Sequence, residues 1–175
     1  LKNLGINSSR VRNCLLCGGG RVAIYLATAL EKGGIAVTIV ERDPDRCREL
    51  SELLPNSTII RGNVADTDLL ESEGLSDFDA VVTLTGEEEL NMIVSLYASS
   101  VGVPQVITKL GHISNRNILD TLKLGSVVCP KDLVSNNIVR YVRAMQNQSG
   151  AAVTVHAIAD GQAEAVEFLV DDATK

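Results

Sequence analysis

The chain has 175 residues and a formal net charge of −6 at pH 7, with 45% hydrophobic but only 3% aromatic residues. This acidic balance excludes the usual nucleic-acid partners, because proteins that bind the phosphate backbone concentrate Lys and Arg. The longest apolar runs, such as residues 80–84, are far shorter than the roughly 20 residues of a membrane helix, so we expect no direct membrane insertion. The length suits one domain and part of a second. Because the sequence opens on Leu1, we expect it to be part of a longer chain.

After a stretch without clear periodicity (residues 1–12), which we interpret as a linker, short apolar runs alternate with amphipathic stretches. The expected strands are residues 13–17, 36–40, 57–60, 80–84, 105–109 and 126–129. The expected helices are residues 21–32, 43–54, 66–72, 87–101, 115–123 and 131–145. This alternation predicts an α/β fold of the Rossmann-like kind, a doubly wound parallel sheet of about six strands with helices on both faces.

The pattern changes in the last part of the chain. Residues 146–150 are polar and typical of turns, and two strand-like runs, 152–159 and 162–170, flank the hairpin-favouring pair Asp160-Gly161. We therefore predict a Rossmann-like domain over residues 13–145. Residues 146–175 are expected to be the start of a truncated C-terminal subdomain with a β-hairpin.

Two of the four cysteines, Cys14 and Cys17, form a C-x-x-C that invites a redox or zinc interpretation. Both lie on one expected strand, separated by three steps of about 3.3 Å, and so point to opposite faces. That separation exceeds the roughly 7 Å that a disulfide tolerates between Cα atoms. We therefore expect four buried, reduced cysteines, with Cys47 and Cys129 as the others, and no metal site.

A glycine-rich turn carries the main chemical signal. Residues 18–23 read G-x-G-x-x-A, an accepted dinucleotide fingerprint, and lie between the first strand and the first helix. Gly18 allows the tight turn, and Gly20 lets a pyrophosphate approach the backbone. The helix N-terminus offers unpaired N–H groups to phosphates. The candidate phosphate-binding residues are Gly18, Gly19, Gly20, Arg21 and Val22.

An acidic residue follows the second strand at the place where ribose hydroxyls bind. Glu41 stands twenty-three residues after Gly18, which fits the spacing of the fingerprint. The neighbouring Arg42 offers a partner for a 2′-phosphate, which Glu41 would repel. We favour NAD or NADH over the phosphorylated cofactors, and ATP or ADP remains an alternative occupant of the same turn.

Other strand ends are expected to line the crevice, since ligands of open α/β sheets bind outside the carboxyl ends of the strands. Asn63 and Val64 follow the third strand. Lys109, after the fifth strand, offers a charge for a phosphate. The candidates after the fourth strand lie in residues 85–91, of which Thr85, Gly86 and Asn91 are singled out.

The run from Asn13 to Met145 resembles the potassium-transport nucleotide-binding domains, the RCK or KTN family, in the form found in TrkA-type regulatory subunits of potassium uptake systems. The resemblance is carried by residues 17–23, 40–46, 61–63, 84–91 and 125–130. It implies that Gly18 and Gly20 hold phosphates, that Glu41 holds ribose and that Asn63 and Val64 lie near adenine. Ala23 in place of a third Gly and Asn63 in place of Asp depart from the family pattern.

The resemblance also implies a cytoplasmic regulator that senses NAD(H) or ATP/ADP, forms a dimer or ring, and controls an integral membrane potassium transporter at the inner face of the plasma membrane. Such a regulator is not an enzyme, and we expect no catalytic residues. The alternative is the nucleotide-binding domain of an NAD-dependent oxidoreductase. That reaction requires a proton-transfer group, for which His112 is a candidate, whereas Tyr-x-x-x-Lys is absent. A structural half-domain with a non-functional nucleotide site is a third possibility.

Overall fold

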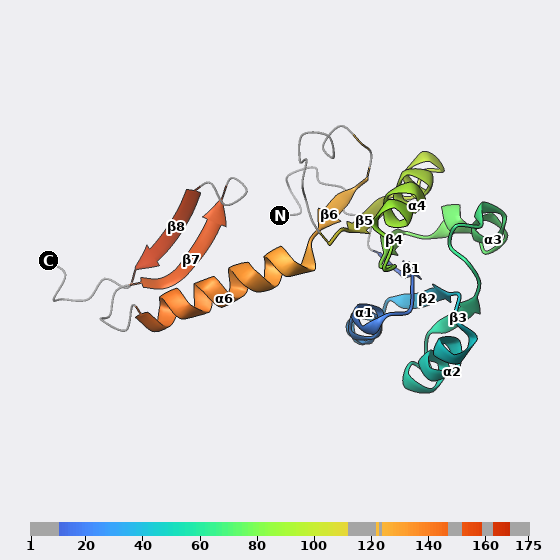
Figure 1. Ribbon diagram of the computed structural model, residues 1–175, viewed down its shortest axis with the longest axis horizontal. Helices are drawn as coiled ribbons and strands as arrows, with labels where there is room; N and C mark the ends of the chain where they lie inside the picture. The colour runs from blue at the N-terminus through green and yellow to red at the C-terminus, as the bar shows by residue number, and fades with distance from the viewer. Residues whose placement is uncertain (1–10, 112–121, 123, 147–151, 159–162, 169–175) are drawn as a thin grey trace, which may run out of the picture. The chain divides into compact units, whose positions relative to one another are not determined.

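The computed structural model describes residues 11–111, 122, 124–146, 152–158 and 163–168. The chain divides into two compact units, Leu1–Cys129 and Pro130–Lys175 (Figure 1). Ten residues of the expected linker, 1–10, lie outside the described residues, as do most of the expected helix at 115–123 and His112.

The first unit is built on a six-stranded parallel sheet with the strand order β3-β2-β1-β4-β5-β6. The strands are β1 (Asn13–Cys17), β2 (Ala36–Glu41), β3 (Thr58–Arg61), β4 (Ala80–Thr83), β5 (Gln105–Lys109) and β6 (Ser126–Val128). The chain runs from β1 outward to β3 and then returns to place β4 on the free side of β1. This reversal of direction opens a crevice at the carboxyl ends of β1 and β4. The expected fold class, a Rossmann-like doubly wound sheet, is confirmed.

Helices cover both faces of this sheet (Figure 1). On one face lie α1 (Arg21–Lys32) and α2 (Pro44–Leu53), and on the other lie α3 (Thr67–Ser72) and α4 (Glu88–Ser100). A short 3₁₀ helix, η1 (Leu75–Asp77), was not expected from the sequence. It follows Gly74, whose φ of +73° favours glycine, and its three residues are too few to show a helical period.

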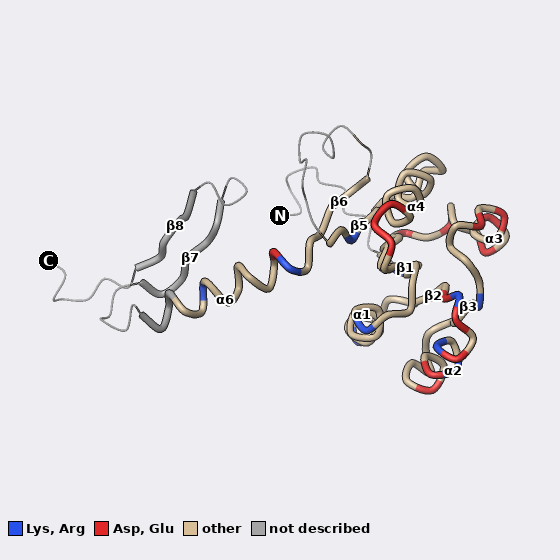
Figure 2. The backbone as a smooth tube through the Cα atoms, viewed as in Figure 1, with Lys and Arg blue, Asp and Glu red and all other residues tan. Residues whose placement is uncertain are grey.

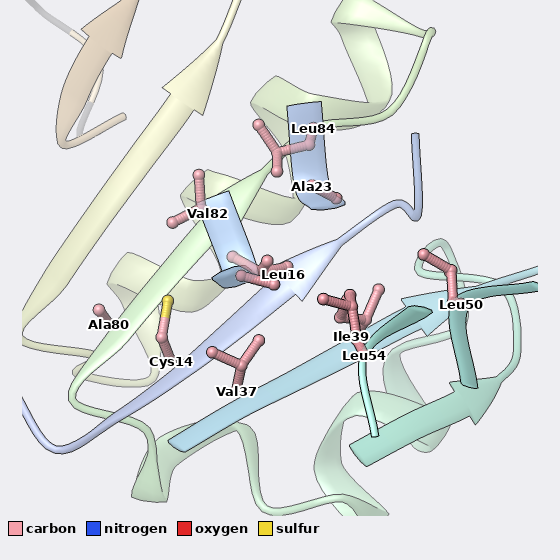
Figure 3. Packing of buried hydrophobic residues seen from close by; sticks show 11 residues of the cluster. Cys14, Leu16, Ala23, Val37, Ile39, Leu50, Leu54, Ala80, Val82 and Leu84 are labelled. Atoms are coloured by element: carbon pink, nitrogen blue, oxygen red, sulfur yellow. The ribbon is translucent and has the colours of Figure 1, made fainter. Parts of the chain in front are cut away.

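The alternation of side chains along β1 divides the core into two clusters. Cys14 and Leu16 pack on the α1/α2 side of the sheet, together with Ile39, Leu50 and other residues (Figure 3). Leu15 and Cys17 pack on the α3/α4 side. The two cysteines of the C-x-x-C therefore point to opposite faces, and all four cysteines are free and buried, as expected.

Three buried hydroxyl groups link β4, α4 and β5 on the α4 side. Thr83, Ser95 and Thr108 are each fully buried. The Thr83 and Ser95 oxygens are 3.1 Å apart, and those of Ser95 and Thr108 are 2.7 Å apart. The Thr108 hydroxyl donates toward the Ser95 oxygen and toward the Leu124 carbonyl, which lies 2.6 Å away. Each buried hydroxyl group thus has a partner.

The second unit contains α6 (Pro130–Gln146) and an antiparallel hairpin of β7 (Ala152–Ile158) and β8 (Ala163–Phe168). The two strands match the runs expected from the sequence, whereas the turn pair Asp160-Gly161 lies outside the described residues. The division at Cys129/Pro130 differs from the boundary at 145/146 proposed from the sequence and groups α6 with the hairpin. Periodicity identifies an amphipathic helix after a strand, but it does not reveal the unit to which that helix belongs.

Candidate functional site

A cavity of about 400 Å³ lies at the carboxyl ends of the central strands. Its wall comes from the turn after β1, the segments after β2 and β3, and the loop between β4 and α4. The lining residues are Gly18, Gly19, Gly20, Val40, Glu41, Arg42, Gly62, Asn63, Val64, Leu84, Thr85, Gly86, Glu87 and Leu90. Nine of the thirteen residues proposed from the sequence are among them, and Arg21, Val22, Asn91 and Lys109 are not.

The surrounding structure leaves little room for a side chain at two residues of the glycine turn. Gly18 has a φ of +107°, and a Cβ there would lie 3.1 Å from the Thr85 backbone nitrogen. A Cβ on Gly19 would collide with the Leu50 side chain. The Gly18 amide donates to the Val40 carbonyl at 2.9 Å, which ties the turn to β2.

Gly20 differs from the other two glycines because a Cβ there would meet no atom within 4 Å. Its φ of −67° and ψ of −179° are open to any residue, so local strain does not explain the glycine. Gly20 is the N-cap of α1 and has no side-chain capping hydrogen bond. Within the described contacts, the amides of Gly20, Arg21 and Val22 have no acceptor. A helix start with free N–H groups beside an open cavity is suited to an anion.

The Glu41 carboxylate lies against the glycine turn. Its Oε2 accepts the Gly19 amide at 2.7 Å, and its Oε1 accepts the Asp43 amide at 2.9 Å. Each oxygen keeps a second lone pair, so the carboxylate has capacity for two further donors, such as the hydroxyl groups of a ribose. Glu41 therefore shapes the turn besides lining the cavity, a role that spacing along the chain did not indicate.

Arg46, in the first turn of α2, holds the same glycine from its other end. Its Nε donates to the Gly19 carbonyl at 2.7 Å, and its guanidinium also pairs with Glu49. Asp43 caps α2 by accepting the amides of Asp45 at 2.8 Å and Arg46 at 3.1 Å, and these bonds lower the pKa of the Asp43 carboxyl. Arg46 was not predicted as a site residue from the sequence, although its place in the first turn of the helix that follows Glu41 was an available signal.

Asn91 and Lys109 shape the β4–α4 loop from behind the cavity wall. The fully buried Asn91 side chain accepts the Thr85 amide at 3.0 Å and the Thr85 hydroxyl at 2.7 Å, and it donates to the Thr85 and Lys109 carbonyls. The Lys109 ammonium donates to the carbonyls of Leu84 at 3.2 Å and Thr85 at 2.8 Å. In this structure these two residues support the loop that lines the cavity, and they do not line it themselves.

An ion pair joins the two sides of the cavity. Arg42, after β2, lies 3.1 Å from Glu87, the N-cap residue of α4, and both side chains are more than half exposed. Acidic residues gather at this start of α4, where Glu87 is followed by Glu88 and Glu89 (Figure 2). The charged side chains of the lining are Glu41, Arg42 and Glu87, so the lining carries a net charge of −1. A phosphate bound here would therefore depend on backbone amides for stabilisation.

The described residues contain no group of three His, Cys, Asp or Glu side chains arranged to hold a metal ion. The features that fit a ligand are instead the free amides at α1, the open space beside Gly20 and the carboxylate opposite them. These fit the diphosphate and ribose of a dinucleotide or an adenine nucleotide.

A family model described as the TrkA-N domain matches residues 14–130. The chain belongs to the TrkA-N domain family. The TrkA-N match covers the whole six-stranded sheet except the first residue of β1, and it includes every residue of the cavity lining.

Among curated proteins, this TrkA-N chain is 29% identical over 164 residues to the Trk system potassium uptake protein TrkA of Halomonas elongata, a match that covers 94% of this chain and 35% of that protein. It is 28% identical over 178 residues to the Trk system potassium uptake protein TrkA homolog 2 of Methanosarcina mazei, covering 100% of this chain and 38% of that protein. The chain therefore spans little more than a third of the length of these relatives.

Among solved structures, the TrkA-N domain of the inner membrane protein ybaL from Escherichia coli has a TM-score of 0.64 at 18% identity, covering 77% of this chain and 98% of that one. The GsuK channel has a TM-score of 0.63 at 14% identity, covering 88% of this chain and 28% of the channel chain. At these identities the two structures establish a shared fold.

Proposed function

We propose that this TrkA-N domain binds NAD or NADH in the cavity at the carboxyl ends of β1 to β4. The observation that carries the proposal is the α1 N-terminus, where Gly20 leaves open space beside three amides that find no acceptor among the described residues. The amides would hold the diphosphate, with Gly18 and Gly19 forming the turn beneath it. Glu41 would accept the ribose hydroxyls with its remaining lone pairs.

The other lining residues receive roles from their positions in the wall. Asn63 and Val64 would lie beside the base, and the Thr85–Gly86 segment would cover it from the β4 side. Asn91 and Lys109 would act by holding that segment in place. Arg21 and Val22 would contribute their backbone amides, and the exposed Arg21 side chain adds a positive charge near the helix start. ATP or ADP fits the same amides and remains a second candidate ligand.

Two comparisons support the choice of NAD(H) and a role in ion transport. Relatives named Trk system potassium uptake proteins match almost the whole chain. A structure of the GsuK channel bound to NAD shares the fold, with a TM-score of 0.61. We infer a regulatory subunit that controls a membrane potassium transporter and is not an enzyme. In the part of the chain that the structure describes, no helix is both long and apolar enough to cross a bilayer. The transporter partner would bring this chain to the inner face of the plasma membrane.

Regulation requires that the nucleotide distinguish two arrangements of the protein, because a ligand shifts an equilibrium only by its difference in affinity for the two states. We propose that these arrangements belong to a homo-oligomer, a dimer or a ring. Sedimentation velocity of the full-length protein with and without NADH tests this step. An unchanged sedimentation coefficient together with unchanged potassium uptake would overturn it.

Binding itself is tested by thermal unfolding with NADH, NAD, NADPH, ATP and ADP at equal concentrations. A ligand that binds the folded state stabilises it by mass action, by about 2.7 kcal/mol at one hundred times its Kd. We expect the largest rise in Tm with NADH or NAD. No rise with any of the five would overturn the proposal. Turnover of NADH with small carbonyl substrates at ordinary enzyme rates would instead favour the oxidoreductase alternative.

A further inference from the structure

Arg46 lies outside the cavity lining and yet controls one of its walls. We infer that Arg46 is a positioning residue for a diphosphate ligand, acting through the peptide bond between Gly19 and Gly20. This inference rests on the proposed nucleotide binding and names a residue on which it depends. The side chain of Arg46 is 22% exposed, and its Nε lies 2.7 Å from the Gly19 carbonyl oxygen.

The geometry of the peptide bond transmits this contact to the cavity. In a planar trans peptide, the carbonyl oxygen and the following N–H point in opposite directions. The described peptide bonds include no cis bond. With its oxygen held by Arg46, the Gly19–Gly20 peptide must direct the Gly20 amide away from α2. Gly20 lines the cavity, and its amide has no acceptor among the described contacts.

The turn requires such a restraint because three glycines follow one another. Glycine has the widest choice of backbone conformations, so an unrestrained Gly19–Gly20 peptide is free to rotate. Glu41 fixes the amide of Gly19, but that amide belongs to the preceding peptide plane. Arg46 supplies the contact that fixes the next plane. A donor held in its binding orientation loses less entropy when a ligand arrives.

The test compares Arg46→Met with Arg48→Met in the intact chain. Both variants remove one positive charge from α2, and among the described residues the partner of Arg48 is the exposed Asp45. Each variant is titrated with NADH and with adenosine, which lacks the diphosphate, and binding is followed by NMR. We expect the Kd for NADH to rise about tenfold in Arg46→Met, since a charge-assisted hydrogen bond is lost. The Kd for adenosine should stay within about twofold in both variants, as should the Kd of Arg48→Met for NADH.

Each outcome decides between defined alternatives. Wild-type protein that binds neither ligand would overturn the proposed function, and the present inference with it. If the wild type binds NADH and Arg46→Met binds it equally well, only the inference fails. An equal loss for adenosine and NADH assigns Arg46 a general structural role and also overturns it. Arg46→Lys keeps one charged donor and should recover most of the affinity for NADH.

A measurement on the wild type covers the case in which Arg46→Met does not fold. The Nε–H proton of Arg46 should exchange with water more slowly than those of exposed arginines such as Arg48, because it is bonded to the Gly19 carbonyl. The Gly20 amide resonance should shift on addition of NADH and not on addition of adenosine. Free exchange at Arg46 Nε, or a Gly20 amide that does not respond to NADH, would overturn the inference.

Discussion

Glu41 Oε2 accepts the backbone amide of Gly19 at 2.7 Å, so the carboxylate of the proposed ribose site also holds the turn of the proposed phosphate site. The diphosphate and the ribose of a dinucleotide would therefore contact groups that are hydrogen-bonded to each other. Leu50 packs against the same turn, because it occupies the space that a side chain on Gly19 would need.

Replacing Glu41 by Gln should weaken nucleotide binding and lower stability together. The Gln side chain keeps the shape but offers one acceptor oxygen for the amides of Gly19 and Asp43, and its NH₂ group faces the other amide. We expect the free energy of unfolding to fall by about 1 to 2 kcal/mol and the Kd for NADH to rise about tenfold. Urea unfolding and NADH titration measure the two effects. Glu52→Gln, on the exposed side of α2, is the matched control and should change neither.

Gly20→Val should separate binding from folding. The backbone at Gly20 is open to any residue and its Cβ would point into open space, so the free energy of unfolding should change by less than about 1 kcal/mol. The valine methyl groups would fill the place proposed for the diphosphate, so the Tm rise with NADH should vanish. A full Tm rise in Gly20→Val would place the phosphates elsewhere.

A substitution at Gly19 should, in contrast to Gly20→Val, lower the stability of the fold. Gly19→Ala puts a methyl group onto the Leu50 side chain and beside Glu41, and overpacking of this kind destabilises a protein by about 1 to 3 kcal/mol. Chemical denaturation of the two glycine variants side by side tests the contrast. Equal stability of Gly19→Ala and wild type would show that Leu50 moves aside without loss.

Glu87→Gln should change the preference between NADH and NADPH. In the present structure Glu87 neutralises Arg42 at the edge of the cavity. Both side chains are exposed, so the pair contributes less than about 1 kcal/mol to folding. Freed from Glu87, Arg42 becomes available for a 2′-phosphate, and the ratio of the NADPH Kd to the NADH Kd should fall several-fold. Glu89→Gln makes the same change of charge on the same helix turn and should leave the ratio as in wild type.

The buried C-x-x-C thiols predict a loss of stability at high pH. Burial raises the pKa of Cys14 and of Cys17 from 9.0 to about 12. Below pH 9 both states hold the thiol protons, so the contribution to stability is complete. Between pH 9 and 12 the unfolded chain releases these protons while the folded chain keeps them, and stability falls as pH rises. Each thiol contributes a slope of about 1.4 kcal/mol per pH unit.

Urea unfolding at pH 8, 9.5 and 11 measures this decline. The double variant Cys14→Ala/Cys17→Ala should show a shallower decline than the wild type, although its starting stability is lower because of the lost side-chain volume. Parallel curves for the two proteins would show that other groups cause the decline. At pH 8 the folded wild type should resist iodoacetamide at both positions, since the thiolate is the reactive form.

Local patterns were sufficient to predict the sheet, its flanking helices and the glycine turn. Alternation along β1 correctly separated Cys14 from Cys17, and spacing located Glu41 beside the turn. Contacts across the crevice were beyond the reach of these patterns. Lys109 was expected to face a phosphate, but its ammonium lies on the carbonyls of the β4–α4 loop. That outcome depends on where the β4–α4 loop places the Leu84 and Thr85 carbonyls, which no residue of β5 encodes by itself.

The same limit explains why the sequence did not predict Arg46 as a site residue or the pairing of Glu87 with Arg42. An Arg and a Glu near helix starts are common surface residues, and only tertiary packing reveals that one holds the Gly19 carbonyl and the other meets Arg42. Arg46 belongs to the helix after β2, Glu87 caps the helix after β4, and both of these strands adjoin β1. Pairs of this kind become predictable once the strand order is known.

The hydroxyl groups of Thr83, Ser95 and Thr108 fix the position of α4 along its own axis relative to the sheet. Sliding the helix by one turn would strand three polar groups in a dry interior, each at a penalty of about 1 to 3 kcal/mol. Glu87 caps α4 and Asn91 belongs to it, so the cavity edge at Glu87 and the β4–α4 loop held by Asn91 keep their positions relative to the sheet. Any motion caused by nucleotide binding would then move β4, α4 and β5 together, and α4 would not slide along its axis.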